Sequence, residues 1–201
     1  MNYLDISDQS LTARTLAGDK EAFTTLMRRH KVWLYNFVRR YLSDPDEAHD
    51  VVQESFASAW NALSRYDPQR DFSIWLRSIA LNKCRDRARY QATRRFLLPW
   101  GGSSPETVSA DPLTGPDETL MQKELVGVVQ RAINDLPDVL KDSIILTALE
   151  GLSHAEAAAV LGVTAKTVEG RVSRGRKLLS STLHCGLLGG DHHHDHDDDE
   201  C

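Results

Sequence analysis

Cysteine, strand-forming alternation and long apolar runs are all scarce in this sequence. Three cysteines among 201 residues are too few for a disulfide framework. No run of about 18 apolar residues is present, so the sequence predicts no membrane-spanning helix. The N-terminal residues lack the basic-then-apolar pattern of a secretory signal, and we therefore expect the chain to stay in the cytoplasm.

Motifs for catalysis are lacking too. The sequence has no Gly-rich phosphate loop, no nucleophile-elbow serine motif and no HExxH pair. We therefore predict that the protein is not an enzyme. What is present, 41% hydrophobic and 26% charged residues, is ordinary globular composition and argues against wholesale disorder.

The net charge of −5 conceals a strong asymmetry along the chain. The last eleven residues contain six acids and no base. Residues 77–95, by contrast, contain seven bases and one acid, and residues 164–183 contain five bases and one acid. Two basic segments in a nominally acidic protein predict two contacts with a polyanion.

Helical periodicity runs through most of the chain, so the predicted fold class is all-α. Residues 97–118 contain four of the seven prolines and three glycines, which is typical of a linker. We expect two small helical domains, residues 1–95 and 119–183, joined by a flexible linker over residues 96–118. A short tail, residues 184–201, follows the second domain.

The clearest helix of the first domain begins after Asp44, whose carboxylate can cap it, with Pro45 in the first turn and Glu47 able to complete a capping box. Its apolar residues follow the i, i+3, i+4 spacing of a buried stripe. They are Ala48, Val51, Val52, Phe56, Ala59, Trp60 and Leu63.

Two further helices are expected in this domain. One runs from Asp19 to about Tyr41, and its apolar stripe includes Met27 and His30. The other runs from Phe72 to about Tyr90, with an apolar, aromatic first half and a basic second half. Cys84 lies in that basic half and is expected to be a packed thiol.

Residues 150–164, EGLSHAEAAAVLGVT, predict a helix, a tight turn and the start of a second helix. Ser153 and Glu156 form a capping box, Gly162 permits a positive φ, and Thr164 caps the second helix. The first turn of the second helix carries hydroxyl and basic side chains, which suit contact with the DNA major groove. The alternative is that these helices form an ordinary helical hairpin whose basic face is solvated. The residues left for DNA are Lys166, Thr167, Arg171, Arg174, Arg176 and Lys177.

Together these motifs resemble the extracytoplasmic-function sigma factors of bacterial RNA polymerase. DPDEAHDVVQESFASAW (44–60) is similar to the family's polymerase-binding helix, and FSIWLRSIALN (72–82) to its promoter-melting segment. EGLSHAEAAAVLGVTAKTVEGRVSRGRKLL (150–179) resembles its second conserved domain. The resemblance covers residues 12–95 and 120–183, and it implies a sigma factor whose partners are core RNA polymerase and promoter DNA.

The resemblance also assigns roles to individual positions. Those matching the grip on the polymerase clamp helices are Asp50, Val52, Gln53, Glu54 and Phe56. Those matching the segment that opens the minus-ten element are Phe72, Trp75, Asn82, Lys83, Arg85, Arg87 and Arg89. The second basic helix matches the minus-thirty-five recognition helix, from which Gly170 departs by replacing a small hydroxyl residue. Without the resemblance, the acidic face of the helix that begins after Asp44 has an alternative interpretation as a solvated surface.

The tail concentrates metal-ligating side chains. Its imidazole and thiolate groups together suit zinc, copper, cadmium or nickel. The candidate ligands are His184, Cys185, His192, His193, His194, His196 and Cys201. A cloning tag, an acidic tail without metal specificity and adventitious metal binding are the alternatives. The tail resembles the cysteine-rich extension of the CorE-like group of these sigma factors, but with fewer cysteines and more His and Asp.

The predicted function is therefore a sigma factor acting in a metal or envelope stress response, with metal binding to the tail as a means of control. It needs no cofactor for promoter recognition. The alternatives are a stand-alone helix-turn-helix regulator, a sigma factor controlled only by an anti-sigma factor, and a metal-storage protein.

Overall fold

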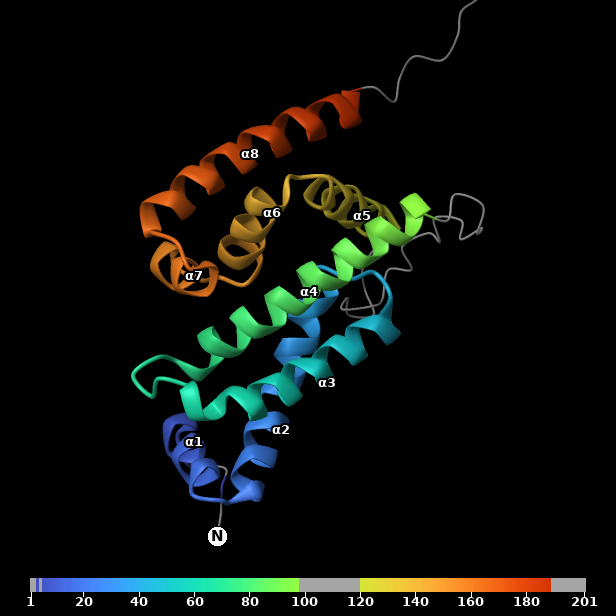
Figure 1. Ribbon diagram of the computed structural model, residues 1–201. Helices are drawn as coiled ribbons and strands as arrows, with labels where there is room; N and C mark the ends of the chain where they lie inside the picture. Colours follow the sequence, from blue (N-terminus) through green and yellow to red (C-terminus); the bar gives the residue numbers. More distant parts are fainter. Residues whose placement is uncertain (1–2, 4, 98–119, 189–201) are drawn as a thin grey trace, which may run out of the picture. The chain divides into compact units, whose positions relative to one another are not determined.

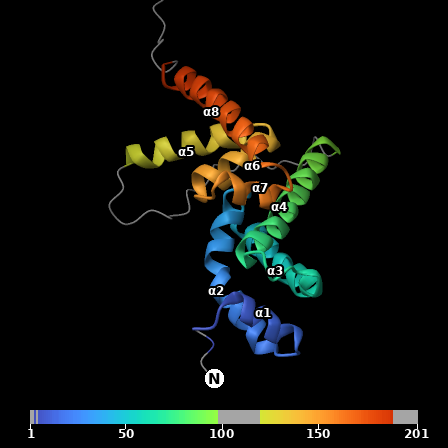
Figure 2. The same ribbon diagram turned by 90° about the vertical axis from the view of Figure 1, so that its left-hand side faces the viewer.

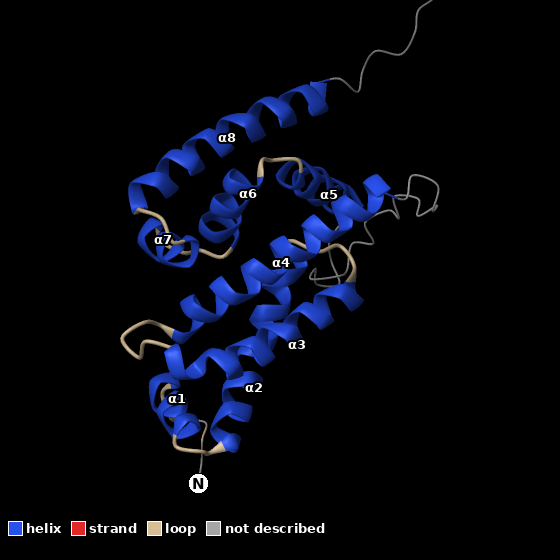
Figure 3. Cartoon of the chain, viewed as in Figure 1, coloured by secondary structure: helices blue, strands red, loops and turns tan. Residues whose placement is uncertain are grey.

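The structure is a computed structural model that describes residues 3, 5–97 and 120–188. All regular secondary structure in these residues is helical, and no strand occurs in them (Figure 3). The predicted all-α class is therefore confirmed, while the predicted linker and most of the tail lie outside the described residues. By their contacts α1–α4 and α7 group into one compact unit, and α5, α6 and most of α8 into another.

The first part of the chain contains four α-helices (Figure 1). They are α1 (Asp8–Leu16), α2 (Lys20–Arg39), α3 (Pro45–Ala62) and α4 (Phe72–Leu97), with a 3₁₀ turn, η1 (Leu63–Arg65), after α3. Asp44 caps α3 with its carboxylate, as the sequence predicts, and Asp19 caps α2 in the same way. Glu47 accepts a hydrogen bond from Gln91 of α4, which links it to the neighbouring helix. The sequence analysis did not identify α1.

The core of these four helices lies where α3 packs against both α2 and α4 (Figure 2). Leu26, Leu34 and Phe37 of α2 are fully buried there, and so is Leu76 of α4. Apolar burial of this kind contributes about 25 cal/mol for each square ångström removed from water. One continuous core therefore holds α3 against both α2 and α4.

The second part contains α5 (Leu120–Asn134), α6 (Asp138–Ile144), a π-helical turn η2 (Ile145–Leu149), α7 (His154–Leu161) and α8 (Ala165–Leu188). The predicted capping box of α7 is present: Glu156 N–H donates to Ser153 Oγ, and Ser153 N–H donates to Glu156 Oε2 at 2.8 Å. Gly162 ends α7 with φ of 66°, and α8 starts three residues later. The predicted helix, turn and helix are therefore found at these positions.

Two glycines of α8 have contrasting surroundings. A Cβ on Gly175 would lie 2.9 Å from Ile144 Cγ1, so the missing side chain allows α8 to approach α6 closely. A Cβ on Gly170 would meet nothing within 4 Å. Packing within the protein therefore accounts for Gly175 but not for Gly170.

Candidate polymerase and nucleic-acid interfaces

The residues predicted to contact polymerase divide into exposed and buried groups. Asp50, Gln53 and Glu54 are exposed on α3, as a binding face requires. Val52 and Phe56 are only 2% and 3% exposed, because the helical spacing turns both toward the core. Val52 therefore offers almost no surface to a partner, whereas Phe56 also lines the groove described next.

An apolar groove of about 560 Å³ lies beside Gln53, between α2 and α3. Met27 and Trp60 stand at its surface with exposures of 37% and 42%, and Trp60 packs edge-to-face on Phe23 with ring centroids 4.9 Å apart. The sequence analysis placed both residues in buried stripes. At about 100° per residue, Trp60 lies roughly 110° from the centre of the α3 stripe and only about 20° from Gln53. That position was the signal that could have identified Trp60 as a surface residue.

The aromatic start of α4 is more deeply buried than expected. Phe72 is 2% exposed, and its ring packs among those of Tyr66, Trp75 and His30, at centroid distances of 5.7, 5.6 and 5.2 Å. Phe72 is therefore a core residue, and the prediction that it offers a free surface for melted bases is wrong. Trp75 is half-buried against Tyr66, which leaves part of its ring accessible.

The basic half of α4 lies along α3. Asn82 and Arg89 are exposed, and Arg89 pairs with Asp86 at 2.5 Å. Lys83 and Arg87 pair instead with Glu54 of α3, at 3.8 and 3.2 Å. Arg85 is half-buried. Cys84 is 1% exposed, which confirms its predicted packing.

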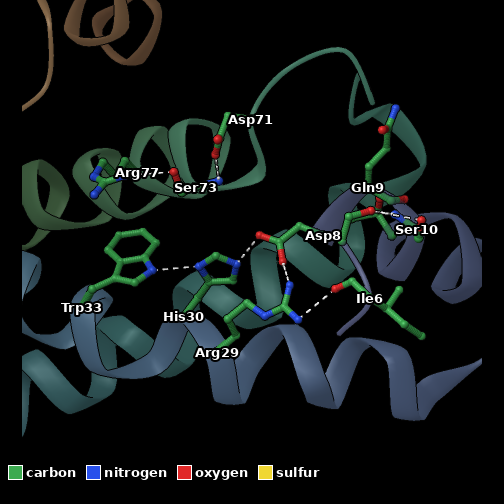
Figure 4. Close-up of polar contacts among 12 residues, drawn as sticks. Ile6, Asp8, Gln9, Ser10, Arg29, His30, Trp33, Asp71, Ser73 and Arg77 are labelled. Carbon is green, nitrogen blue, oxygen red and sulfur yellow. Dashed lines mark hydrogen bonds and ion pairs between the residues drawn. The ribbon is translucent and has the colours of Figure 1, made fainter. Parts of the chain in front are cut away.

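A polar network that the sequence analysis missed joins α1, α2 and α4 (Figure 4). Trp33 Nε1 donates to His30 Nδ1 at 2.7 Å, and His30 Nε2 lies 2.7 Å from a carboxylate oxygen of Asp8. Because an indole N–H can only donate, Nδ1 is unprotonated and Nε2 donates to Asp8. The guanidinium of Arg77 stacks over the Trp33 ring at 4.3 Å.

Asp8 is the carboxylate of this network and contacts both His30 and Arg29. Burial alone would raise the pKa of Asp8, but hydrogen bonds from His30 and Arg29, together with the positive charge of Arg29, outweigh burial and lower it. A carboxylate with a lowered pKa stabilises the fold above its unfolded pKa, and that contribution is lost as the pH falls through the folded value. The network therefore fixes α1 on α2 and holds Arg77 near the start of α4.

The predicted recognition residues of α8 share one face, with one exception. At about 100° per residue, Lys166, Thr167, Arg171, Arg174 and Lys177 fall within an arc of about 140°. Val168 and Val172, only 0% and 3% exposed, lie on the opposite side. Gly170 lies inside the basic arc, and Arg174 Nε donates to its carbonyl oxygen at 3.2 Å. Arg176 lies beyond the basic arc and next to Glu169, about 80° from Lys166, the nearest residue of the arc.

Little of the predicted metal site falls within the described residues. His184 is exposed near the end of α8, and Cys185 follows it in the same helix. The other five candidates, His192, His193, His194, His196 and Cys201, lie outside the described residues. No cluster of three or more His, Cys, Asp or Glu suited to a metal occurs in the described part of the chain. None of the described helices is long and apolar enough to span a membrane.

Both parts of the chain match known protein families. Residues 26–94 match the family described as Sigma-70 region 2, and residues 127–179 match Sigma-70, region 4. RNA polymerase sigma factor CnrH of Cupriavidus metallidurans is 36% identical over 180 residues, which span 88% of this chain and 94% of that protein. The ECF RNA polymerase sigma-E factor of Escherichia coli is 30% identical over 191 residues, 89% of this chain and 95% of that protein.

Solved structures agree. The structure of CnrH in complex with the cytosolic domain of CnrY has a TM-score of 0.64 and 34% identity, covering 92% of this chain and 99% of that chain. The sigma factor RpoE of Bartonella quintana, in complex with the anti-sigma factor NepR, has the same TM-score at 26% identity, covering 81% of this chain and 96% of that chain.

The two matched regions define a sigma factor, a class of transcription initiation factor rather than an enzyme. The chain belongs to the sigma-70 family, in its extracytoplasmic-function group. It binds core RNA polymerase and directs transcription initiation at specific promoters. The stand-alone helix-turn-helix regulator and the metal-storage protein are thereby excluded.

Proposed function

We propose that two surfaces of the first domain, residues 1–95, divide the work of initiation. The exposed residues Asp50, Gln53 and Glu54 of α3, with the adjoining groove, bind the polymerase clamp. The basic half of α4 holds the melted minus-ten element, through Trp75 and the polar set Asn82, Lys83, Arg85, Arg87 and Arg89. The observation that carries this proposal is an acidic set of exposed residues on α3 beside a basic set on α4, on two helices packed into one core.

We further propose that residues 119–183 read the minus-thirty-five element through the basic face of α8, while residues 96–118 serve as the linker. The reading residues are Lys166, Thr167, Arg171, Arg174 and Lys177. Arg groups hydrogen-bond guanine edges and Lys groups hold phosphates, so one basic face can both read and anchor the duplex. The protein acts in the cytoplasm, where polymerase and promoter are found.

The groove contributes apolar contact area next to the acidic residues. Trp60→Ala is expected to weaken binding of the full chain to core polymerase by at least tenfold, because partly exposed Trp residues are frequent hot spots of interfaces. Affinity would be measured by fluorescence anisotropy well below the unfolding temperature of the variant. Val32→Ala, which truncates an α2 residue 70% exposed and outside the groove, is the matched control. Equal affinity for both variants would remove the groove from the interface.

The tail, residues 184–201, is proposed to bind a transition metal ion such as zinc, copper, cadmium or nickel. Its six carboxylates compete with DNA phosphates for Arg171, Arg174 and Lys177 when the metal is absent. A divalent ion bound by the tail's imidazoles and thiols cancels this charge and releases the recognition helix. The activity thereby responds to metal, with promoters of a metal or envelope stress response as its targets.

Deletion of residues 184–201 is expected to abolish any metal dependence of promoter binding by the holoenzyme. The measurement compares binding with chelator and with added Zn²⁺, Cu²⁺, Cd²⁺ or Ni²⁺. Replacing the imidazoles of His192, His193, His194 and His196 by Ala keeps the six acids and is expected to give constant inhibition. Unchanged metal dependence after the deletion would contradict the proposal. If metal instead inhibits the full chain, the metal-bound tail, and not the metal-free tail, would be the inhibitory form.

A separate inhibitor is a second means of control. Two of the solved relatives have another protein bound, the cytosolic domain of CnrY in one and the anti-sigma factor NepR in the other. These complexes support an anti-sigma partner for this chain as well. If the purified chain and core polymerase are fully active at every metal concentration, control by a separate anti-sigma factor would be favoured over control by metal binding to the tail.

A further inference from the structure

Glu54 occupies a position shared by the two proposed surfaces of the first domain. It belongs to the exposed acidic face of α3, yet its carboxylate lies against α4. One oxygen, Oε1, is 3.2 Å from Arg87 Nη2, and the other, Oε2, is 3.8 Å from Lys83 Nζ. These two cations are four residues apart and thus lie on the same face of α4.

The contact is partly open to solvent. The Glu54 side chain is 49% exposed, and those of Lys83 and Arg87 are 34% and 25% exposed. Together with Asp86 and Tyr90 they line a cavity of about 280 Å³. A partner can therefore reach either side of the ion pair without unfolding the helices around it.

From this geometry we infer that Glu54 is a gate between polymerase binding and DNA binding. In the free chain its carboxylate offsets part of the positive charge of Lys83 and Arg87 and weakens their attraction for an approaching phosphate. A cationic group of the polymerase that pairs with Glu54 releases both α4 cations for the DNA backbone. The inference rests on the proposed roles of α3 and α4 and adds a coupling between them, which by linkage acts in both directions.

The surrounding charges fit a local gate. Asp86, the other carboxylate of the cavity, already pairs with Arg89 on its own helix. Glu47, two turns before Glu54 on α3, accepts a hydrogen bond from the neutral amide of Gln91. Among the described side chains, loss of charge at Glu47 therefore frees no cation, whereas loss of charge at Glu54 frees two. The pair provides a matched comparison on one helix.

The test measures binding of the free, full-length chain to a fluorescein-labelled 20-nucleotide DNA single strand of mixed sequence at low salt. Such a probe is sufficient because phosphate contacts do not depend on sequence. Glu54→Gln is expected to bind about threefold to tenfold more tightly than the parent, a modest gain because exposed ion pairs are weak. Glu47→Gln, with the same change in charge, is expected to stay within about 1.5-fold of the parent, since no cation is released.

Removal of the cations separates the gate from general electrostatics. In the Lys83→Ala/Arg87→Ala background, Glu54→Gln is expected to give no gain. A gain that persists there, or equal gains for Glu54→Gln and Glu47→Gln, would overturn the gate. If Lys83→Ala/Arg87→Ala binds the DNA strand as the parent does, the proposed DNA contact of α4 fails, and the gate fails with it.

A second experiment, in the presence of core polymerase, tests whether polymerase releases Lys83 and Arg87 from Glu54. With core enzyme at a concentration that saturates both proteins, the advantage of Glu54→Gln over the parent is expected to be smaller than in the free chain, because polymerase has already released the cations of the parent. A Glu54→Gln advantage that is as large in the holoenzyme as in the free chain would show that polymerase does not act on Glu54.

Discussion

Reversing the charge of the acidic α3 face, with Asp50→Lys and Glu54→Lys together, is expected to weaken binding to core polymerase at least a hundredfold. Both side chains are exposed, and the contacts removed at Glu54 are its partly exposed ion pairs with Lys83 and Arg87. Each change removes an attraction to a basic partner and adds a repulsion, and like charges brought together at an interface cost several kcal/mol. A hundredfold loss corresponds to about 2.7 kcal/mol. Anisotropy titration of labelled protein with core enzyme measures it.

The matched control is Glu21→Lys with Asp67→Lys, which adds the same charge at exposed positions outside α3. It is expected to change the affinity for core by less than threefold, since exposed charges more than a Debye length apart, about 8 Å at physiological salt, interact weakly. A similar loss in both double variants would mean that net charge, and not the α3 face, governs the association.

Truncating two arginines of the recognition face, Arg171→Ala with Arg174→Ala, is expected to weaken specific promoter binding by the holoenzyme 30-fold to 1,000-fold. Each arginine that contacts a guanine edge contributes about 1–3 kcal/mol of discrimination, and lost phosphate contacts lower the salt slope by about one each. Affinity for core polymerase should be unchanged. The measurement is promoter binding by the reconstituted holoenzyme over a range of salt concentrations.

Two single variants locate the effect on α8. Arg131→Ala removes an exposed arginine of α5 and serves as the neutral control. Arg176→Ala removes an arginine that lies outside the basic arc of α8, and is expected to reduce affinity less than threefold. A loss at Arg176 equal to that at Arg174 would show that α8 enters the groove with a different face.

The sequence predicted the local structure well because its signals are short-range. The carboxylates of Asp19 and Asp44, the Ser153–Glu156 capping box and Gly162 each satisfy nearby backbone groups, so their roles can be identified without a tertiary structure. The order of the helices and the family resemblance followed from such local patterns. The family assignment needed no side-chain geometry.

The errors concern which side chains reach the surface. Phe72 lies at the end of a loop, but the rings of Tyr66, Trp75 and His30 enclose it. Trp60 follows the apolar period of α3, but it lies at the edge of the stripe, where α2 covers it only in part. The exposure of Trp60 could have been predicted from its angular position on α3. The burial of Phe72, by contrast, depends on contacts with residues distant in sequence, which the periodicity of one helix cannot contain.

The Asp8–His30–Trp33 network and the Glu54 ion pairs escaped the sequence analysis for the same reason. Asp8 and His30 are 22 residues apart, and Glu54 and Arg87 are 33 residues apart. Neither pair has a spacing that marks it in the sequence. Tertiary packing alone brings these groups together, and it is also what makes Glu54 a shared element of two surfaces.

The most direct test of the account is run-off transcription from a promoter library by purified core polymerase. The account predicts promoter-specific transcripts with the parent chain, none with the α3 charge-reversed variant, and strongly reduced levels with Arg171→Ala/Arg174→Ala. The absence of transcripts with the parent, together with failure to bind core enzyme, would contradict it. So would full activity of the charge-reversed variant, because α3 would then not be the surface that recruits polymerase.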